Sequence, residues 1–409
     1  MTRELYDKIS DLLLFAVNFQ EGDKITLAAE IDQRPVILNL VETAYKRGAA
    51  FVDVDYRDPV LQALAIQGAQ KSFWFPGYLQ EKFREITQKG WKLIGVYSET
   101  SADVFNGLDG LRSSRYFQDL AKVVALRMKA VMSNQIPWTL TYLPSEAMAK
   151  KAFPNLSAEK ALQAYWELVI KIMRLDEDDP VAFWKKKAEN DAIRVAYMDS
   201  LQPEYLHFQG PGTDLKVGLA EKAQWVGGFD TCPDGTRFMA NIPTDEIFTS
   251  PDWRKTDGRV TLTKPFVMHQ NLGAVPQKAW FVFHEGRVVD YGAEEGKESL
   301  DNLFRRDDRA RYIGEVALVD PQSPFASPGI TFYNGLYDEN AACHIALGKA
   351  YPATLKERKD YTDEELRDLG LNTSDIHEDM MIGGEQVDVT AYSRDGKKQD
   401  IIRDGRFVI

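Results

Sequence analysis

Residues 24–56 read KITLAAEIDQRPVILNLVETAYKRGAAFVDVDY, and this stretch decides the fold of the first half of the chain. A strand-like run (24–31) is followed by a helical segment (34–48), which has Pro35 near its first turn and stops near Gly48. A second strand-like run (49–56) comes directly after it. A strand, a helix and another strand at this spacing predict a right-handed crossover within a parallel sheet.

The same alternation continues on both sides of this stretch. Further strands are expected at 92–99 and 137–144, and helices at 4–18, 58–70, about 117–133, about 157–174 and 179–200. From about residue 203 the pattern changes to short strand-like runs joined by glycine-containing turns, at 205–220, 224–228, 260–270 and 279–296. We therefore expect an α/β fold, with an N-terminal parallel-sheet domain (1–200) followed by a mixed α+β domain (201–409).

Composition narrows the classes of function. A chain of 409 residues with 44% hydrophobic and 27% charged residues is typical of a globular protein with two domains. The net charge of -12 argues against non-specific nucleic-acid binding and against docking on anionic membranes. Cys232 and Cys343 lie far apart and do not form a disulfide framework. With no signal-peptide pattern and no long apolar stretch, we expect a cytoplasmic protein.

The common catalytic motifs are absent. The sequence contains no G-x-G-x-x-G, no P-loop and no G-x-S-x-G. His284-Glu285 and His377-Glu378 both begin like H-E-x-x-H, but neither has the second histidine four residues after the first. The zinc-binding helix of that motif is therefore excluded.

Other side chains that could bind metal lie in unusual settings. His377 and Asp379 are two residues apart, so in an extended segment both point to the same side and form a compact N/O ligand pair. Glu315 lies within an apolar strand-like run, where a buried carboxylate needs a partner. Glu246 lies in a segment bracketed by prolines (240–251). Taken singly, each has a plainer explanation, such as a solvated glutamate or a structural histidine.

The segment 336–351, LYDENAACHIALGKAY, carries Glu339 and His344. Its small residues predict a short helix over 341–347 that ends near Gly348. On a regular helix these two side chains would not share a face, so they converge only if Glu339 lies on the turn before it. The remaining histidines, His207, His269 and His284, lie in alternating strand-like runs and receive no role.

Four segments together resemble the aminopeptidase T / aminopeptidase S / PepS family of bacterial metallopeptidases. They are NIPTDEIFTSP (241–251), IGEVALV (313–319), FYNGLYDENAACHIALGKAY (332–351) and NTSDIHEDMMIG (372–383). Their order and spacing are specific, and the length and two-domain layout match as well, so the resemblance covers the whole chain. One departure is Asp245, where many relatives are expected to have glycine. It lies beside a ligand position and does not replace it.

The resemblance implies a metallo-aminopeptidase whose catalytic domain is the second one. Two divalent ions (Zn, Co or Mn) are expected, with six ligands: Glu246, Glu315, Glu339, His344, His377 and Asp379. The resemblance also assigns catalytic roles to Glu315 and Tyr351, peptides with a free N-terminus as substrates, and a homodimer. The formal charges of this ligand set and of the two ions cancel, since four carboxylates carry -4 and two divalent ions carry +4.

Two alternatives remain open at this point. The same ligands could serve another two-metal hydrolase, such as an esterase or phosphatase, or a protein that binds metal or peptide without turnover. An open catalytic site differs from a closed structural one in its free coordination position.

Overall fold

The computed structural model describes residues 2–69, 73–98, 102–105, 107–268, 275–320, 323–326, 329–357, 359 and 361–409. The chain divides into two compact units, Met1–Lys185 with Phe229–Pro243, and Lys186–Gly228 with Thr244–Ile409. The division lies inside helix α8 (Pro180–Leu201), between Lys185 and Lys186. The segment Phe229–Pro243 belongs with the first unit although it follows part of the second in sequence.

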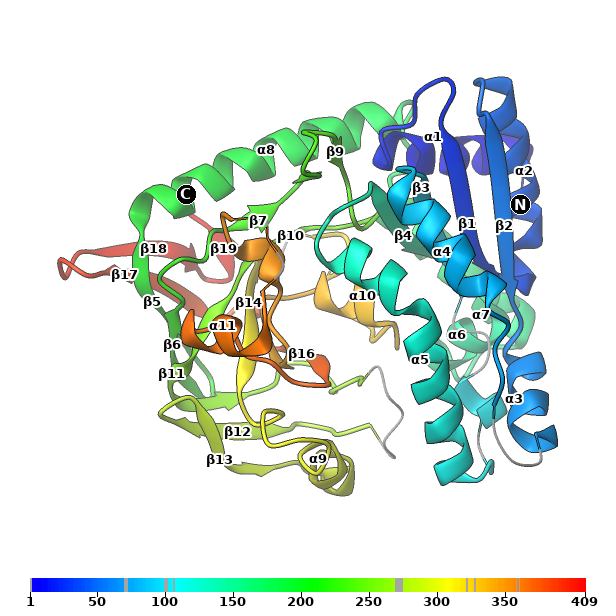
Figure 1. Ribbon diagram of the computed structural model, residues 1–409. Coiled ribbons are helices and arrows are strands. Elements are labelled where there is room, and N and C mark those ends of the chain that lie inside the picture. The colour runs from blue at the N-terminus through cyan, green and yellow to red at the C-terminus, as the bar shows by residue number, and fades with distance from the viewer. Residues whose placement is uncertain are drawn as a thin grey trace. The chain divides into compact units, whose positions relative to one another are not determined.

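The first unit is built on a parallel sheet, as predicted. Its strands are β1 (Lys24–Glu30), β2 (Phe51–Arg57), β3 (Lys92–Tyr97) and β4 (Trp138–Tyr142). They pair in parallel in the order β2-β1-β3-β4 (Figure 1). The middle five residues of β1 are buried. This burial explains its near-continuous apolar sequence, because a parallel sheet is covered by helices on both faces.

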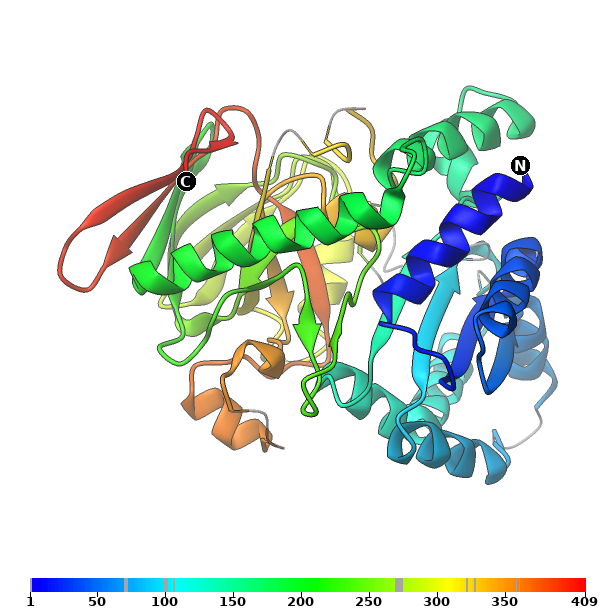
Figure 2. The same ribbon diagram turned by 90° about the horizontal axis from the view of Figure 1, so that it is seen from above.

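Helices lie on both faces of this sheet, with α1 and α2 on one face and α4 and α5 on the other (Figure 2). The helices of the unit are α1 (Arg3–Ala16), α2 (Arg34–Lys46), α3 (Pro59–Gly68), α4 (Tyr78–Gln88), α5 (Gly110–Met132), α6 (Glu146–Ala152) and α7 (Ala158–Ile172). The sequence reading missed α4, in which only Phe83 and Ile86 are buried among many charged and polar residues. No helix in the described part of the chain is long and apolar enough to cross a membrane. A short hairpin, β8 (Asp230–Thr231) and β9 (Arg237–Phe238), completes the unit.

The second unit contains two antiparallel sheets. The larger has the order β13-β12-β11-β6-β5-β17-β18-β19 and the smaller the order β16-β15-β14-β10-β7. The larger sheet comprises β5 (Pro203–Gly210), β6 (Thr213–Leu219), β11 (Pro251–Thr261), β12 (Trp280–His284), β13 (Arg287–Gly292), β17 (Asp388–Ser393), β18 (Lys398–Arg403) and β19 (Arg406–Phe407). The smaller comprises β7 (Val226–Gly227), β10 (Glu246–Thr249), β14 (Ile313–Val319), β15 (His344–Gly348) and β16 (His377–Met381).

One hydrophobic core joins the two sheets of this unit. Phe208 and Phe281 from the larger sheet belong to the same buried cluster as Val316, Ile345 and Met380 from the smaller one. Three short helices, α9 (Lys297–Leu303), α10 (Gly335–Glu339) and α11 (Asp363–Asp368), connect the strands. One face of the smaller sheet is thus committed to the core, and its other face is left for polar side chains.

The helix predicted over 341–347 is wrong. Residues His344–Gly348 form strand β15, which pairs with β14 on one side and β16 on the other, and all five residues are buried. Alanine is the best helix former, but helix propensity differs by less than about 1 kcal/mol per residue, and pairing along both edges with full burial outweighs it. Gly348, with φ of 101°, has the backbone of Ile376 so close that a side chain would clash.

Candidate metal centre

The smaller sheet of the second unit brings five of the six predicted ligands onto one face. In an antiparallel sheet, directly paired residues point to the same side. Ala346 pairs with Glu315 on one neighbouring strand and with Asp379 on the other. By the same alternation, the face carries Glu246, Glu315, His344, His377 and Asp379. The residues between them on this face, Ala317 and Ala346, have small side chains.

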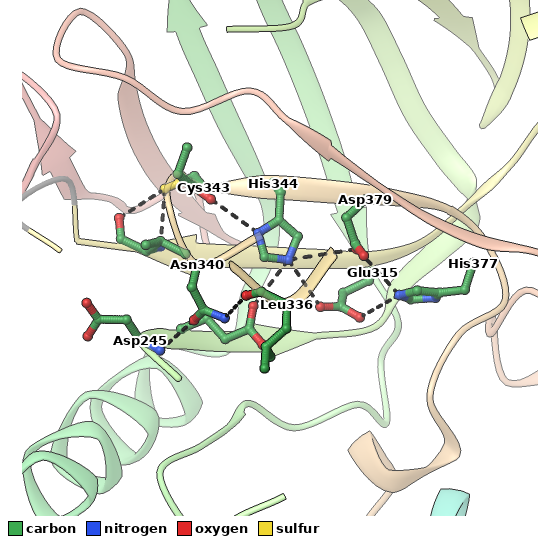
Figure 3. A network of polar contacts seen from close by, with 11 residues as sticks. Asp245, Glu315, Leu336, Asn340, Cys343, His344, His377 and Asp379 are labelled. Atoms are coloured by element: carbon green, nitrogen blue, oxygen red, sulfur yellow. Dashed lines mark hydrogen bonds and ion pairs between the residues drawn. The ribbon is translucent and has the colours of Figure 1, made fainter. Parts of the chain in front are cut away.

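The two imidazoles meet a shared set of carboxylates (Figure 3). His344 Nε2 lies 3.2 Å from Glu246 Oε2, 3.6 Å from Glu315 Oε1 and 4.0 Å from Asp379 Oδ1. His377 Nε2 lies 3.4 Å from Glu315 Oε2 and 3.4 Å from Asp379 Oδ1. Glu315 therefore offers one oxygen to each histidine, and Asp379 offers the same oxygen to both.

Backbone carbonyls fix the orientation of both rings. His344 Nδ1 lies 3.2 Å from the carbonyl oxygen of Ala342, and His377 Nδ1 lies 2.7 Å from that of Lys349. A carbonyl oxygen only accepts, so Nδ1 carries the proton in each ring. In the neutral imidazole, Nε2 is then the atom free to bind a metal. A hydrogen bond from the other ring nitrogen to a carbonyl oxygen is usual for a metal-binding histidine.

Glu339 is the last residue of α10 and lies in the same electrostatic environment. Burial, followed by the charges of Glu246 and Asp379, raises the pKa of Glu339 well above its usual value. Asp338, the residue before it, holds the chain that enters α10. Its carboxylate accepts hydrogen bonds from the backbone N–H groups of Phe332 (2.8 Å) and Asn334 (3.1 Å). Glu339 thus lies before His344 on a separate element.

Tyr351 packs against the ligands. Its ring centroid lies 4.7 Å from that of His377 and 5.9 Å from that of Phe248. Burial, reinforced by Glu315 and the neighbouring carboxylates, raises the pKa of Tyr351 well above its usual value. The phenol therefore keeps its proton at neutral pH and can act as a hydrogen-bond donor.

The buried charged groups of the centre shift one another's pKa values. Burial raises the pKa of Glu315. Burial lowers the pKa of His344, but the carboxylates of Glu246 and Glu315 outweigh this effect and raise it well above its usual value. Burial also lowers the pKa of His377, while Asp379 raises it more, to about 9. In the absence of a cation, protons on these groups balance the charge.

The donor set fits a divalent cation. Glu246, Glu315 and His344 each offer a ligand atom, and these atoms lie within 4.8 Å of one another. Within the described part of the chain, the Oε2 atoms of Glu246 and Glu315 are buried and receive no hydrogen bond of acceptable geometry. Buried carboxylate oxygens without a donor are costly, and a metal ion would satisfy both. Carboxylate and imidazole ligands suit zinc and other first-row transition metals.

The family model described as thermophilic metalloprotease (M29) matches residues 4–407. The chain belongs to the M29 metalloprotease family. Aminopeptidase T of Thermus aquaticus is 35% identical to this M29 protein over 409 residues, covering 99% of each chain. Aminopeptidase 2 of Geobacillus stearothermophilus is 34% identical over 404 residues, covering 98% of this chain and 97% of that protein. The predicted resemblance to the aminopeptidase T family is confirmed.

Solved structures agree on the fold of this M29 chain. Wild-type AmpT from Thermus thermophilus matches with a TM-score of 0.90 and 31% identity, covering 100% of this chain and 99% of that one. A 2,5-dihydroxypyridine dioxygenase from Pseudomonas putida KT2440 matches with a TM-score of 0.56, covering 100% of this chain and 98% of that one. At 11% identity, that second match shows a shared fold alone.

Sequence reasoning missed two features of the M29 centre. Ala346, on β15, lies between Glu315 and Asp379 of the two neighbouring strands, and the spacing of His344, Ala346 and Gly348 would have revealed this had the run been interpreted as a strand. Asn340 contacts the segment before Glu246, and no local pattern signals this contact.

Of the histidines without a predicted role, His207 lies 2.6 Å from Asp214 and His284 lies 3.2 Å from Asp257, on the larger sheet. His269 lies outside the described residues.

Proposed function

We propose that this chain is an aminopeptidase that holds two divalent metal ions and releases the N-terminal residue of peptides. One observation carries the two-metal part of the proposal. The two oxygens of Glu315 face different imidazoles, and Asp379 Oδ1 is within 4.0 Å of both. Ligands shared in this way would suit two divalent ions, with Glu315 and Asp379 available to both.

The ligand set proposed for the two ions is the one expected from the resemblance. Glu246 and His344 would serve one ion, His377 the other, and Glu315 and Asp379 would be shared, with Glu339 adding a fourth carboxylate from α10. Zinc, cobalt and manganese are all compatible with this set. The homodimer is likewise a proposal that rests on the resemblance, and light scattering of the purified protein tests it.

Bound divalent ions supply Lewis acidity toward a peptide carbonyl and lower the pKa of water. Side chains of the protein would transfer the proton, stabilise the developing charge and hold the substrate. The resemblance gives Glu315 the role of accepting and passing on a proton, and its two oxygens lie 3.6 and 3.4 Å from the Nε2 atoms of His344 and His377. The Tyr351 hydroxyl, protonated at neutral pH, would donate a hydrogen bond to the oxygen that gains charge. A carboxylate of the centre would hold the free α-amino group, which restricts release to the first residue.

A substrate panel tests the assignment directly. The metal-loaded enzyme is expected to hydrolyse aminoacyl-p-nitroanilides and to leave N-acetylated aminoacyl-p-nitroanilides, p-nitrophenyl acetate and p-nitrophenyl phosphate essentially untouched. Equal activity on acetylated substrates would show that no free amino group is required. Preferential hydrolysis of the phosphate or acetate ester would move the protein to another class of two-metal hydrolase.

Tyr351 offers a sharper test of the chemistry. Tyr351→Phe keeps the ring that packs on His377 and removes only the hydroxyl, so kcat should fall about 10²–10³-fold with unchanged metal content. The control is Phe248→Leu, which alters another ring that packs on Tyr351 without removing a donor. An unchanged kcat in Tyr351→Phe would remove the hydroxyl from the mechanism.

A further inference from the structure

A pocket lies in the same unit as the metal centre. It has a volume of about 420 Å³, and its lining includes Thr263, Lys264, Ala342, Cys343, Gly383 and Gly384. This size falls in the range of small-molecule sites, about 300–1,000 Å³. We call it the Lys264 pocket. None of the ligand side chains described above lines it.

The ammonium group of Lys264 makes fewer hydrogen bonds than it has donors. An ammonium has three N–H donors, yet among the described residues Lys264 Nζ makes a single hydrogen bond, of 3.3 Å, to the carbonyl oxygen of Ile330. The side chain is half-buried, and burial lowers the pKa of Lys264, an effect that the charge of Asp338 only partly offsets. A partly desolvated cation without a carboxylate in contact is stabilised by an anion that enters the pocket.

Apart from Lys264 and Glu385, the lining of the pocket consists of small or uncharged residues. Bare backbone lies at Gly383 and Gly384, and a side chain added at Gly383 would clash with Cys343. Glu385 also lines the pocket, but it is exposed to solvent, so its charge is screened. Lys264 is therefore the charged group there that is removed from water.

The pocket lies a short peptide's length from the metal centre. The Thr263 backbone N–H donates to the carbonyl oxygen of Met381 at 2.9 Å, and Met381 pairs directly with His344. Residues joined in this way have Cα atoms roughly 4.5–5.5 Å apart, so the Cα atoms of Thr263 and His344 are at most about 11 Å apart. An extended peptide spans about 3.3–3.6 Å per residue. A peptide of two or three residues is therefore long enough to span from His344 to the neighbourhood of Thr263 and Lys264.

We propose that the Lys264 pocket binds the C-terminal carboxylate of peptide substrates two or three residues long, and so makes the enzyme selective for short peptides. This inference rests on the proposed aminopeptidase function and adds the substrate class. A carboxylate on an amino acid product has the same chemistry. The experiment therefore separates the peptide from the product.

The test compares substrates that differ only at the far end. The full-length, metal-loaded enzyme is given a tripeptide, its C-terminal amide, and the aminoacyl-p-nitroanilide with the same first residue. The amide should have a KM about tenfold higher than the acid, because one charge-assisted hydrogen bond is lost. Lys264→Met should raise KM for the acid by a similar factor and leave the p-nitroanilide within twofold. Lys264→Arg, which keeps the charge, should retain the preference for the acid.

Lys297→Met is the matched control, since Lys297 is exposed and pairs with Asp301 at 2.7 Å. Equal KM values for acid and amide in the parent enzyme would overturn the proposal, and so would an equal loss on all three substrates in Lys264→Met. Loss of inhibition by the free amino acid product, with an unchanged KM for the tripeptide, would overturn it in favour of a product site. No hydrolysis of any p-nitroanilide would instead overturn the aminopeptidase function itself.

Discussion

The backbone N–H of Asp245 donates a hydrogen bond of 2.5 Å to the side-chain oxygen of Asn340, across 95 residues of sequence. The Asn340 side chain is fully buried, and its nitrogen donates to the carbonyl oxygen of Leu336 at 2.8 Å (Figure 3). Asp245 directly precedes Glu246, and Asn340 directly follows Glu339. One amide side chain therefore sets the separation of two proposed ligands that come from different elements.

The first prediction concerns this amide. Asn340→Ala removes the connection between β10 and α10, so metal affinity should fall about 10–100-fold, the usual effect of losing a group that supports a ligand. Titration of the metal-free protein with Zn²⁺ measures it. Asn302→Ala, on α9, is the control and should bind as the parent does. Parent-like affinity in Asn340→Ala would show that each ligand is held independently of this amide.

The second prediction concerns Ala346. It is fully buried, and its neighbours in the same row are Glu315 and Asp379. Valine suits a strand, but its added methyl groups would enter the space between these carboxylates. Ala346→Val should therefore lose metal content and activity while the protein stays folded.

A core substitution separates this effect from general overpacking. Ala391 is buried in β17, on the larger sheet, and Ala391→Val inserts the same two methyl groups away from the centre. It should lower thermal stability, as overpacking does, with full metal content by elemental analysis. If both variants keep their metal, the space above Ala346 is not occupied by an ion.

These residues also show how far sequence carries the structure. The parallel sheet was predictable because each strand–helix–strand repeat is local, and residues 24–56 contain a complete one. The pairing of His377 and Asp379 on one face was predictable because it follows from alternation in an extended segment, and β16 is such a segment. The run around His344 was misassigned because its strand character comes from two partner strands distant in sequence. The contact between Asp245 and Asn340 depends wholly on tertiary packing, so no local pattern could reveal it.

The third prediction tests ligand identity. His377→Ala removes one imidazole, so the protein should bind fewer ions per chain than the parent and lose most of its activity. Metal counting on the purified protein, together with aminoacyl-p-nitroanilide hydrolysis, measures both. His284→Ala is the matched control, because His284 is exposed and its ring lies 3.2 Å from Asp257, on the larger sheet. Full metal content and activity in His377→Ala would refute the proposed centre.

The fourth prediction follows from competition between protons and metal. Burial lowers the pKa of His377, but Asp379 outweighs it and holds the pKa at about 9 in the metal-free protein. At pH 7 the metal-free ring is therefore protonated, whereas a metal-bound ring is not. His344, whose pKa also lies well above its usual value, carries a second proton. Metal binding at pH 7 should thus release protons, and the release should decline as the pH approaches 10.

Calorimetric titration in buffers of different ionisation enthalpy counts the released protons, and His377→Ala should release fewer than the parent.

The raised pKa of His377 also affects the stability of the metal-free protein. Because the folded pKa is raised, the stabilisation by protonated His377 is fully present below the unfolded pKa of about 6.5. It is lost as the pH rises to about 9. Denaturation of the chelator-treated protein should therefore show falling stability between these values, and metal should abolish the fall. A metal-free protein equally stable at pH 6 and pH 9.5 would show that the centre does not hold its protons in this way.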